Sequence, residues 1–161
     1  MGHDRPRRIR RRQNRPLHGP ARGGDALSAP GVTLVDPSAI GRAAAARDAV
    51  LRYRVDTAAA ASRADFFDAV RGALPMDPPL LGRRGWDALA DSLWSGLHGA
   101  PGDTALIVVT DLTLLHDRAP GEFRTAVGIL TELADTLTDP SFTGGRPTSL
   151  HCLIGLRGAA G

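Results

Sequence analysis

The chain has 161 residues, of which 42% are hydrophobic, so it is long enough and apolar enough for one ordinary hydrophobic core. Its formal net charge is +3. Its only cysteine, Cys152, excludes an internal disulfide, and no apolar run reaches the roughly 18 residues of a membrane span. The basic start is not followed by the apolar segment of a secretory signal. We therefore expect a protein of the reducing cytoplasm that does not contact membranes, with Cys152 as a small buried apolar residue.

The charge is distributed unevenly along the chain. Residues 1–29 contain eight arginines and two aspartates, a formal charge of +6, whereas residues 30–161 carry a formal charge of −3. The first segment is rich in proline and glycine and nearly free of apolar side chains, a composition that predicts a disordered arm. Such an arm can bind nucleic acid weakly and non-specifically. A solvated tail without function, or an incorrectly assigned start codon, explains the same composition.

The first half of the remaining chain predicts two strands and two helices. Residues 32–35 form a short apolar run typical of a strand, and Asp36 and Pro37 suit the N-cap and first position of an alanine-rich helix over 39–49. Residues 51–55 alternate apolar and polar side chains, which predicts a strand. The sequence from Ser62 to Asp65 is similar to a capping box and predicts a helix that ends near Leu74.

The second half predicts two further strands and two longer helices. A helix over about 86–97 precedes the apolar run 105–109, which is typical of a strand buried on both faces. Apolar residues at helical spacing predict a helix over 120–137, then a loop over 139–147 and a last strand over 150–156. We expect Val108 and Leu130 to be buried where strand and helix meet.

Strands that alternate with helices indicate an α/β fold with parallel strands joined by right-handed crossovers. We predict one α/β domain over residues 30–161 that follows the arm 1–29. Whether residues 32–35 add a further strand or lie at an edge stays open at this point.

Two aspartates in the predicted helix over 86–97 lie four residues apart. Asp87 and Asp91 are therefore neighbours on one helix face, where like charges repel by a few tenths of a kcal/mol. The helix dipole favours Asp87 in the first turn but gives no reason for Asp91. A cationic partner would explain both residues. Acid–base catalysis by the pair is not expected on an exposed helix face without a pocket or metal.

The residues around this pair resemble the barstar family, the intracellular protein inhibitors of barnase-type ribonucleases. The family pattern has a helix with Phe and Leu, then Pro, an apolar pair, Gly, and an aromatic residue or Leu before Asp-Ala-Leu-x-Asp-x-Leu. The resemblance covers about residues 50–156. The matching residues are Phe66, Phe67, Pro75, Leu80, Leu81, Gly82, Trp86, Asp87, Ala88, Leu89, Asp91 and Leu93.

The resemblance implies a small parallel sheet of three strands, or four with residues 32–35, and helices packed against it. It also implies that Asp87 and Asp91 bind the cationic groove of a ribonuclease as phosphate mimics. This chain departs from the family at Gly85, where Asn is common, and at Ala90, where a bulky aromatic is common. The partner-binding residues that we predict on this basis are Gly85, Trp86, Asp87, Ala90, Asp91, Trp94, Glu132 and Asp135.

We therefore expect an inhibitor of a basic secreted-type ribonuclease or a similar toxin. We do not expect an enzyme, because the chain has no nucleotide-binding or nucleophile motif, and its five histidines lack metal-ligand spacing. No cofactor and no metal are expected. The alternatives are a barstar-like interaction module with another toxin or regulatory partner, and a nucleic-acid-binding protein that acts through the basic arm.

Overall fold

A sheet of four parallel strands lies at the centre of the structure, a computed structural model that describes residues 29–82 and 85–159. The strands are β1 (Gly31–Val35), β2 (Leu51–Val55), β3 (Thr104–Val109) and β4 (Ser149–Gly155), in the order β1-β4-β3-β2. The predicted α/β fold with a small parallel sheet is confirmed. The segment 32–35 is a fourth strand and also an edge strand, since it pairs only with β4.

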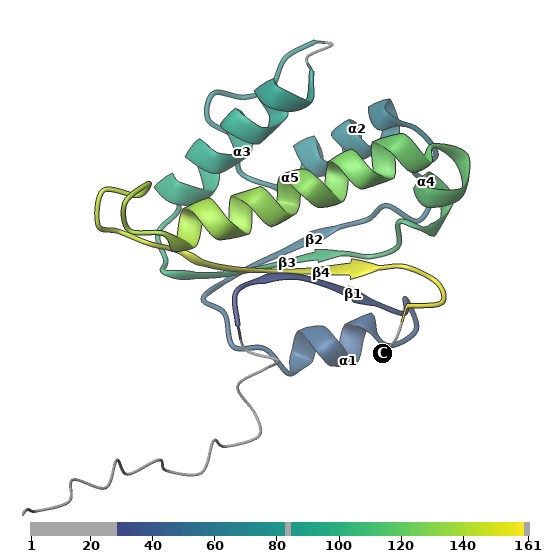
Figure 1. The fold of residues 1–161 in the computed structure, drawn as a ribbon, viewed down its shortest axis with the longest axis horizontal. Helices are drawn as coiled ribbons and strands as arrows, with labels where there is room; N and C mark the ends of the chain where they lie inside the picture. Colours follow the sequence, from purple (N-terminus) through teal and green to yellow (C-terminus); the bar gives the residue numbers. More distant parts are fainter. Residues whose placement is uncertain (1–28, 83–84, 160–161) are drawn as a thin grey trace, which may run out of the picture.

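The helices divide unequally between the two faces of the sheet (Figure 1). One face is covered by α2 (Arg63–Ala73), α3 (Trp86–Gly99), α4 (Thr113–Arg118) and α5 (Pro120–Thr138), and the other carries the short α1 (Ile40–Ala45). Helix α5 lies directly on β4 and β1, and α3 packs against α5. The face of α3 that points away from the sheet is therefore held at the outer surface of the molecule.

Both faces of the sheet bury apolar residues, and this explains why β3 and β4 are almost continuously apolar. A large core lies beneath α2 to α5 and includes Leu130, which is 2% exposed. A smaller cluster of Val35, Ile40, Leu106 and Leu153 lies beneath α1. The expectation that Val108 is buried is wrong: Val108 is only half-buried and packs against the smaller cluster beneath α1.

Helix α1 differs from its prediction at both ends. Asp36 does not cap it, because the carboxylate accepts hydrogen bonds from the backbone nitrogen (3.0 Å) and hydroxyl (2.6 Å) of Ser38 in the preceding turn. The helix begins only at Ile40 and ends at Ala45. Alanine favours helix intrinsically, but propensity is weak beside tertiary packing, and Ile40 is the only buried residue of α1.

Two local features were not predicted from the sequence. Helix α4 has six residues and buries Leu115 in the core. At the carboxyl ends of the strands, a Cβ atom on Gly155 would lie 2.0 Å from the Thr110 carbonyl oxygen, so only glycine allows β4 to approach this turn. The Leu112 backbone nitrogen donates to the Gly155 carbonyl (2.7 Å) at the same contact.

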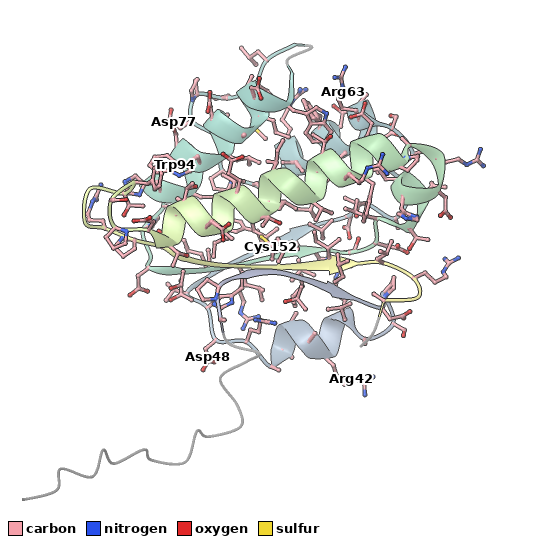
Figure 2. The ribbon with its side chains drawn as sticks, in the orientation of Figure 1. Arg42, Asp48, Arg63, Asp77, Trp94 and Cys152 are labelled. Atoms are coloured by element: carbon pink, nitrogen blue, oxygen red, sulfur yellow. The ribbon has the colours of Figure 1, made fainter. Side chains whose placement is uncertain are left out.

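Cys152 lies on β4 beneath α5 and is fully buried, as expected (Figure 2). Burial raises the pKa of its thiol to about 12, so the side chain is a protonated apolar group at neutral pH. Within 29–82 and 85–159, no helix is long and apolar enough to cross a membrane. The predicted arm, apart from Ala29, lies outside the described residues.

Candidate functional site

The amino end of α3 presents the two aspartates that the sequence singled out. Gly85 is the N-cap residue and has no side chain to satisfy the free backbone N–H groups of the first turn, where Asp87 lies. The helix dipole therefore stabilises an anion at Asp87. Asp91 lies one turn further on, where that effect has declined. Both aspartates are exposed.

Helix α3 is fixed in place by the segment that precedes it. The Asp77 backbone nitrogen donates to the Ser92 carbonyl (3.0 Å), and the Ser92 hydroxyl donates to the Pro78 carbonyl (2.5 Å). A Cβ atom on Gly96 would lie 2.2 Å from the Pro75 carbonyl oxygen, so this glycine lets the backbone segment approach the helix closely. Ser92 is buried, and its neighbour Asp91 is exposed to solvent.

Trp86 is engaged within the fold. Its ring lies 5.7 Å from that of Phe66 and 4.9 Å from that of Phe67, the second at an interplanar angle of 79°. Its indole nitrogen donates to the Glu122 carboxylate (2.8 Å), which ties the start of α3 to the start of α5. The partner-binding residue predicted at this position thus has a packing role that connects three helices.

A hollow of about 140 Å³ opens between α3 and α5. Helix α3 contributes one carboxylate, one small and one aromatic side chain; α5 contributes mainly aliphatic groups and one carboxylate; and the loop after α5 contributes an aromatic side chain. The lining residues are Ala90, Asp91, Trp94, Ile129, Glu132, Leu133, Thr136 and Phe142. Figure 2 shows Trp94 on the part of α3 that is nearest to that loop.

Asp91 also borders a second hollow, of about 280 Å³, on the other side of α3. Its remaining lining residues are Pro78, Pro79, Leu80, Ala88 and Ser92. Asp91 therefore lies on the ridge between two depressions, a position from which its carboxylate is accessible to a partner surface.

The carboxylates of this face have no cationic partner among the described residues. Ion pairs in the described part of the chain join Arg54 to Asp56, Arg71 to Asp68 and His116 to Asp117. The acidic residues Asp87, Asp91, Glu132 and Asp135 are all exposed, and none forms an ion pair with another residue that the structure describes. Within residues 29–82 and 85–159, the face formed by α3 and α5 therefore carries negative charge that no cationic side chain neutralises.

The structure brings together four of the predicted residues, Ala90, Asp91, Trp94 and Glu132, around one hollow. Asp87 lies one helical turn before them, and Asp135 lies on α5 outside the hollow.

Residues that the sequence did not single out complete the lining, chiefly Ile129, Leu133 and Phe142. Phe142 is 63% exposed. One of only four phenylalanines in the chain, it stands among Pro, Ser, Thr and Gly in a predicted loop, and this contrast is the signal that could have identified it.

Other features of the surface do not gather comparable chemistry. A larger hollow of about 700 Å³ lies along α2 and includes Ser62, Arg63 and Arg71, but it is lined by charges of both signs. In the part of the chain that the structure describes, no group of three or more potential ligand side chains is placed to hold a metal ion.

Comparison with known proteins gives a match to one family model. Residues 50–154 match the family model described as Barstar (barnase inhibitor), a span that runs from the residue before β2 into β4. Comparisons with curated proteins and with solved structures found no match. The match covers more than half of the chain and contains β2, β3, helices α2 to α5 and all of β4 except Gly155. By this match, the chain belongs to the barstar family.

Proposed function

We propose that this protein inhibits a basic ribonuclease of the barnase type by placing the outer face of α3 in the groove where the enzyme binds RNA. Such a groove is cationic because it binds phosphate groups. Carboxylates held on a rigid helix reproduce the charge of those phosphates. In this proposal Asp87 and Asp91 are the main groups, and Glu132 on α5 adds a third.

The observation that carries this proposal is the negative charge on the face of α3 and α5, for which the described residues provide no cationic partner. The helix dipole accounts for Asp87 but not for Asp91, and the two carboxylates repel each other at four residues' distance, so the stability of the fold does not explain the pair. The backbone contacts of Ser92 and Gly96 hold the helix that carries them. Surface charges arranged in this way favour fast and selective association with a basic partner.

The test is a binding titration of the purified protein with barnase and with basic ribonucleases secreted by the source organism. Asp91→Ala should weaken binding to the tightest of these enzymes by about 2–5 kcal/mol, since one member of a desolvated charge pair is lost. Its thermal midpoint should stay the same or rise slightly, because a like-charge repulsion is removed. Calorimetry, RNA-cleavage assays and thermal melts provide the measurements.

The matched control is Asp48→Ala, which removes an exposed aspartate that lies on the side of the sheet occupied by α1 (Figure 2). It removes one negative charge, as Asp91→Ala does, and should leave binding within a few tenths of a kcal/mol. Equal affinity of Asp91→Ala and the wild type would contradict the role of α3. An unfolded Asp91→Ala variant would instead assign Asp91 to the fold.

A second candidate is a barstar-like interaction module for a different toxin or regulatory protein. The observation in its favour is the shape of the face: Ala90 borders a hollow at a position where the family commonly has a bulky aromatic. If this second function is correct, the protein inhibits no barnase-type ribonuclease, and the face of α3 and α5 binds another basic protein instead. Absence of inhibition across the whole set of ribonucleases would favour this candidate over the first.

A further inference from the structure

The hollow between α3 and α5 is an apolar feature within an acidic face. Its walls are formed by Trp94, Ile129, Leu133 and Phe142, and Ala90 leaves it open. Leu133 is buried, whereas Trp94 and Ile129 are half-buried. Leu133 belongs to the main core, and Trp94 and Ile129 pack against it, so the hollow lies at the outer margin of that core.

Phe142 is held in place although it is exposed. In the loop after α5, the Phe142 backbone nitrogen donates to the Asp139 carbonyl (3.2 Å), and the Thr143 hydroxyl donates to the same oxygen (3.1 Å). The Asp139 carboxylate accepts from the backbone nitrogen (2.8 Å) and the hydroxyl (2.7 Å) of Ser141. Thr143 is 3% exposed, so the loop is anchored on both sides of Phe142.

An aromatic side chain on a loop of this kind costs little conformational entropy when a partner covers it. Interfaces obtain much of their affinity from such preorganised aromatic anchors. The volume of the hollow, about 140 Å³, suits one side chain, since an apolar cavity of similar volume holds a benzene molecule. Its lining is apolar except for Thr136 and the two carboxylates, Asp91 and Glu132.

We propose that this hollow receives one apolar side chain, of the size of leucine or phenylalanine, that protrudes from the basic surface of the protein partner. Phe142, Trp94 and Ile129 surround that side chain, while the carboxylates of Asp91 and Glu132 pair with cations next to it. Charge complementarity specifies the partner, because the lining contains two acidic residues and no basic residue. The inference rests on the proposed function and adds to it the feature that selects among basic ribonucleases.

The first experiment fills the hollow. Ala90→Phe should reduce affinity for the ribonuclease that binds the wild type most tightly by about tenfold or more, because the partner side chain is excluded. The second removes a wall: Phe142→Ala should also reduce affinity by about tenfold. The controls are Ala45→Phe, on the exposed side of α1, and Val50→Ala, which truncates a residue that is 68% exposed outside the hollow. Both controls should bind as the wild type does.

The outcomes separate this inference from the proposed function. If Asp91→Ala loses affinity while Ala90→Phe and Phe142→Ala bind as tightly as the wild type, the hollow receives nothing and only this inference is overturned. If the wild type binds no ribonuclease of the set, the proposed function and the inference both fail.

Sedimentation of the free protein provides a further check, because a wild-type dimer that Phe142→Ala dissociates would assign the hollow to a second copy of this chain. Thermal melts identify any variant that fails to fold, and the remaining variant then decides.

Discussion

At the scale of single residues, neighbouring members of one sequence motif take on different tasks. Trp86 and Asp87 are adjacent, yet the indole is engaged with Phe67 and Glu122 while the carboxylate is exposed to solvent. Helical periodicity predicted that Asp87 and Asp91 share an outer face. It could not predict the role of Trp86, because Glu122 lies 36 residues away and meets it only in the folded chain.

Core burial leads to a prediction that separates the two faces of the sheet. Leu130→Ala should lower the free energy of unfolding by about 2–4 kcal/mol, because Leu130 is 2% exposed in the main core and truncation leaves a cavity. Val108→Ala should cost only about 1 kcal/mol, since Val108 is half-buried beside α1. Urea unfolding of both variants measures the difference, and equal losses would contradict this assignment of faces.

A buried histidine predicts a dependence of stability on pH. Burial, and then the charge of Arg47 with its guanidinium nitrogen 3.3 Å from Nδ1, lower the pKa of His151 below its ordinary value of 6.5. The native state then binds fewer protons than the unfolded state, so stability is highest above the unfolded pKa and falls as pH drops through it. The thermal midpoint should therefore decrease between pH 7.5 and pH 5.5.

Replacing the histidine tests its contribution to this slope. His151→Gln should flatten the dependence across this window, because it removes the histidine whose pKa burial lowers. The aspartates whose pKa is lowered titrate further into acid, so they do not contribute here. An unchanged slope in His151→Gln would show that another group is responsible.

At the scale of elements, the sequence predicted what depends on local pattern and missed what depends on distant contacts. The long amphipathic helices and the apolar strands were predicted with ends close to those observed, because their burial imposes periods of 3.6 and 2 on the sequence. Helix α4 is too short to show a period. The prediction of α1 relied on alanine content alone and made the helix too long. The hollow could not be predicted, because it forms only when α3, α5 and the loop at Phe142 come together in the folded chain.

The close contact of α3 with the preceding segment predicts opposite effects for two glycine substitutions. Gly96→Ala should destabilise the protein by about 1–3 kcal/mol, because the added methyl group overlaps the Pro75 carbonyl. Gly128→Ala on α5 meets open space and should stabilise it by about 0.5–1 kcal/mol through helix propensity. Chemical denaturation measures both changes, and a neutral Gly96→Ala would mean that α3 shifts without cost.

At the scale of the whole molecule, the family match and the fold do not begin at the same place. Residues 50–154 match the family, while β1 and α1 precede that span, and β1 adds the fourth strand of the sheet. The sequence predicted strand 32–35 from its apolar run but not its partner. Pairing with β4 joins residues more than a hundred positions apart, and no local pattern encodes such a contact.

Removal of residues 1–28 tests whether the basic arm contributes to the fold or to binding. The thermal midpoint should stay within about one or two degrees, because every described element follows Ala29. Inhibition of a ribonuclease should persist under the proposed function, and gel-shift assays should show any non-specific RNA binding of the full chain disappear. A large drop in the midpoint would contradict the expectation, as would a loss of inhibition.

The order of strands in the sheet also determines at what point of translation the sheet can first assemble. Strand β4 is translated after the other three, yet it lies between β1 and β3 and pairs with both. Until residues 149–155 have left the ribosome, β1 has no neighbour, and β2 and β3 form only an isolated pair of parallel strands. Because the entropy of closing such long loops must be overcome before any pairing stabilises the chain, folding waits for the last strand. Strand order thus delays the appearance of the acidic face until translation of this domain is complete.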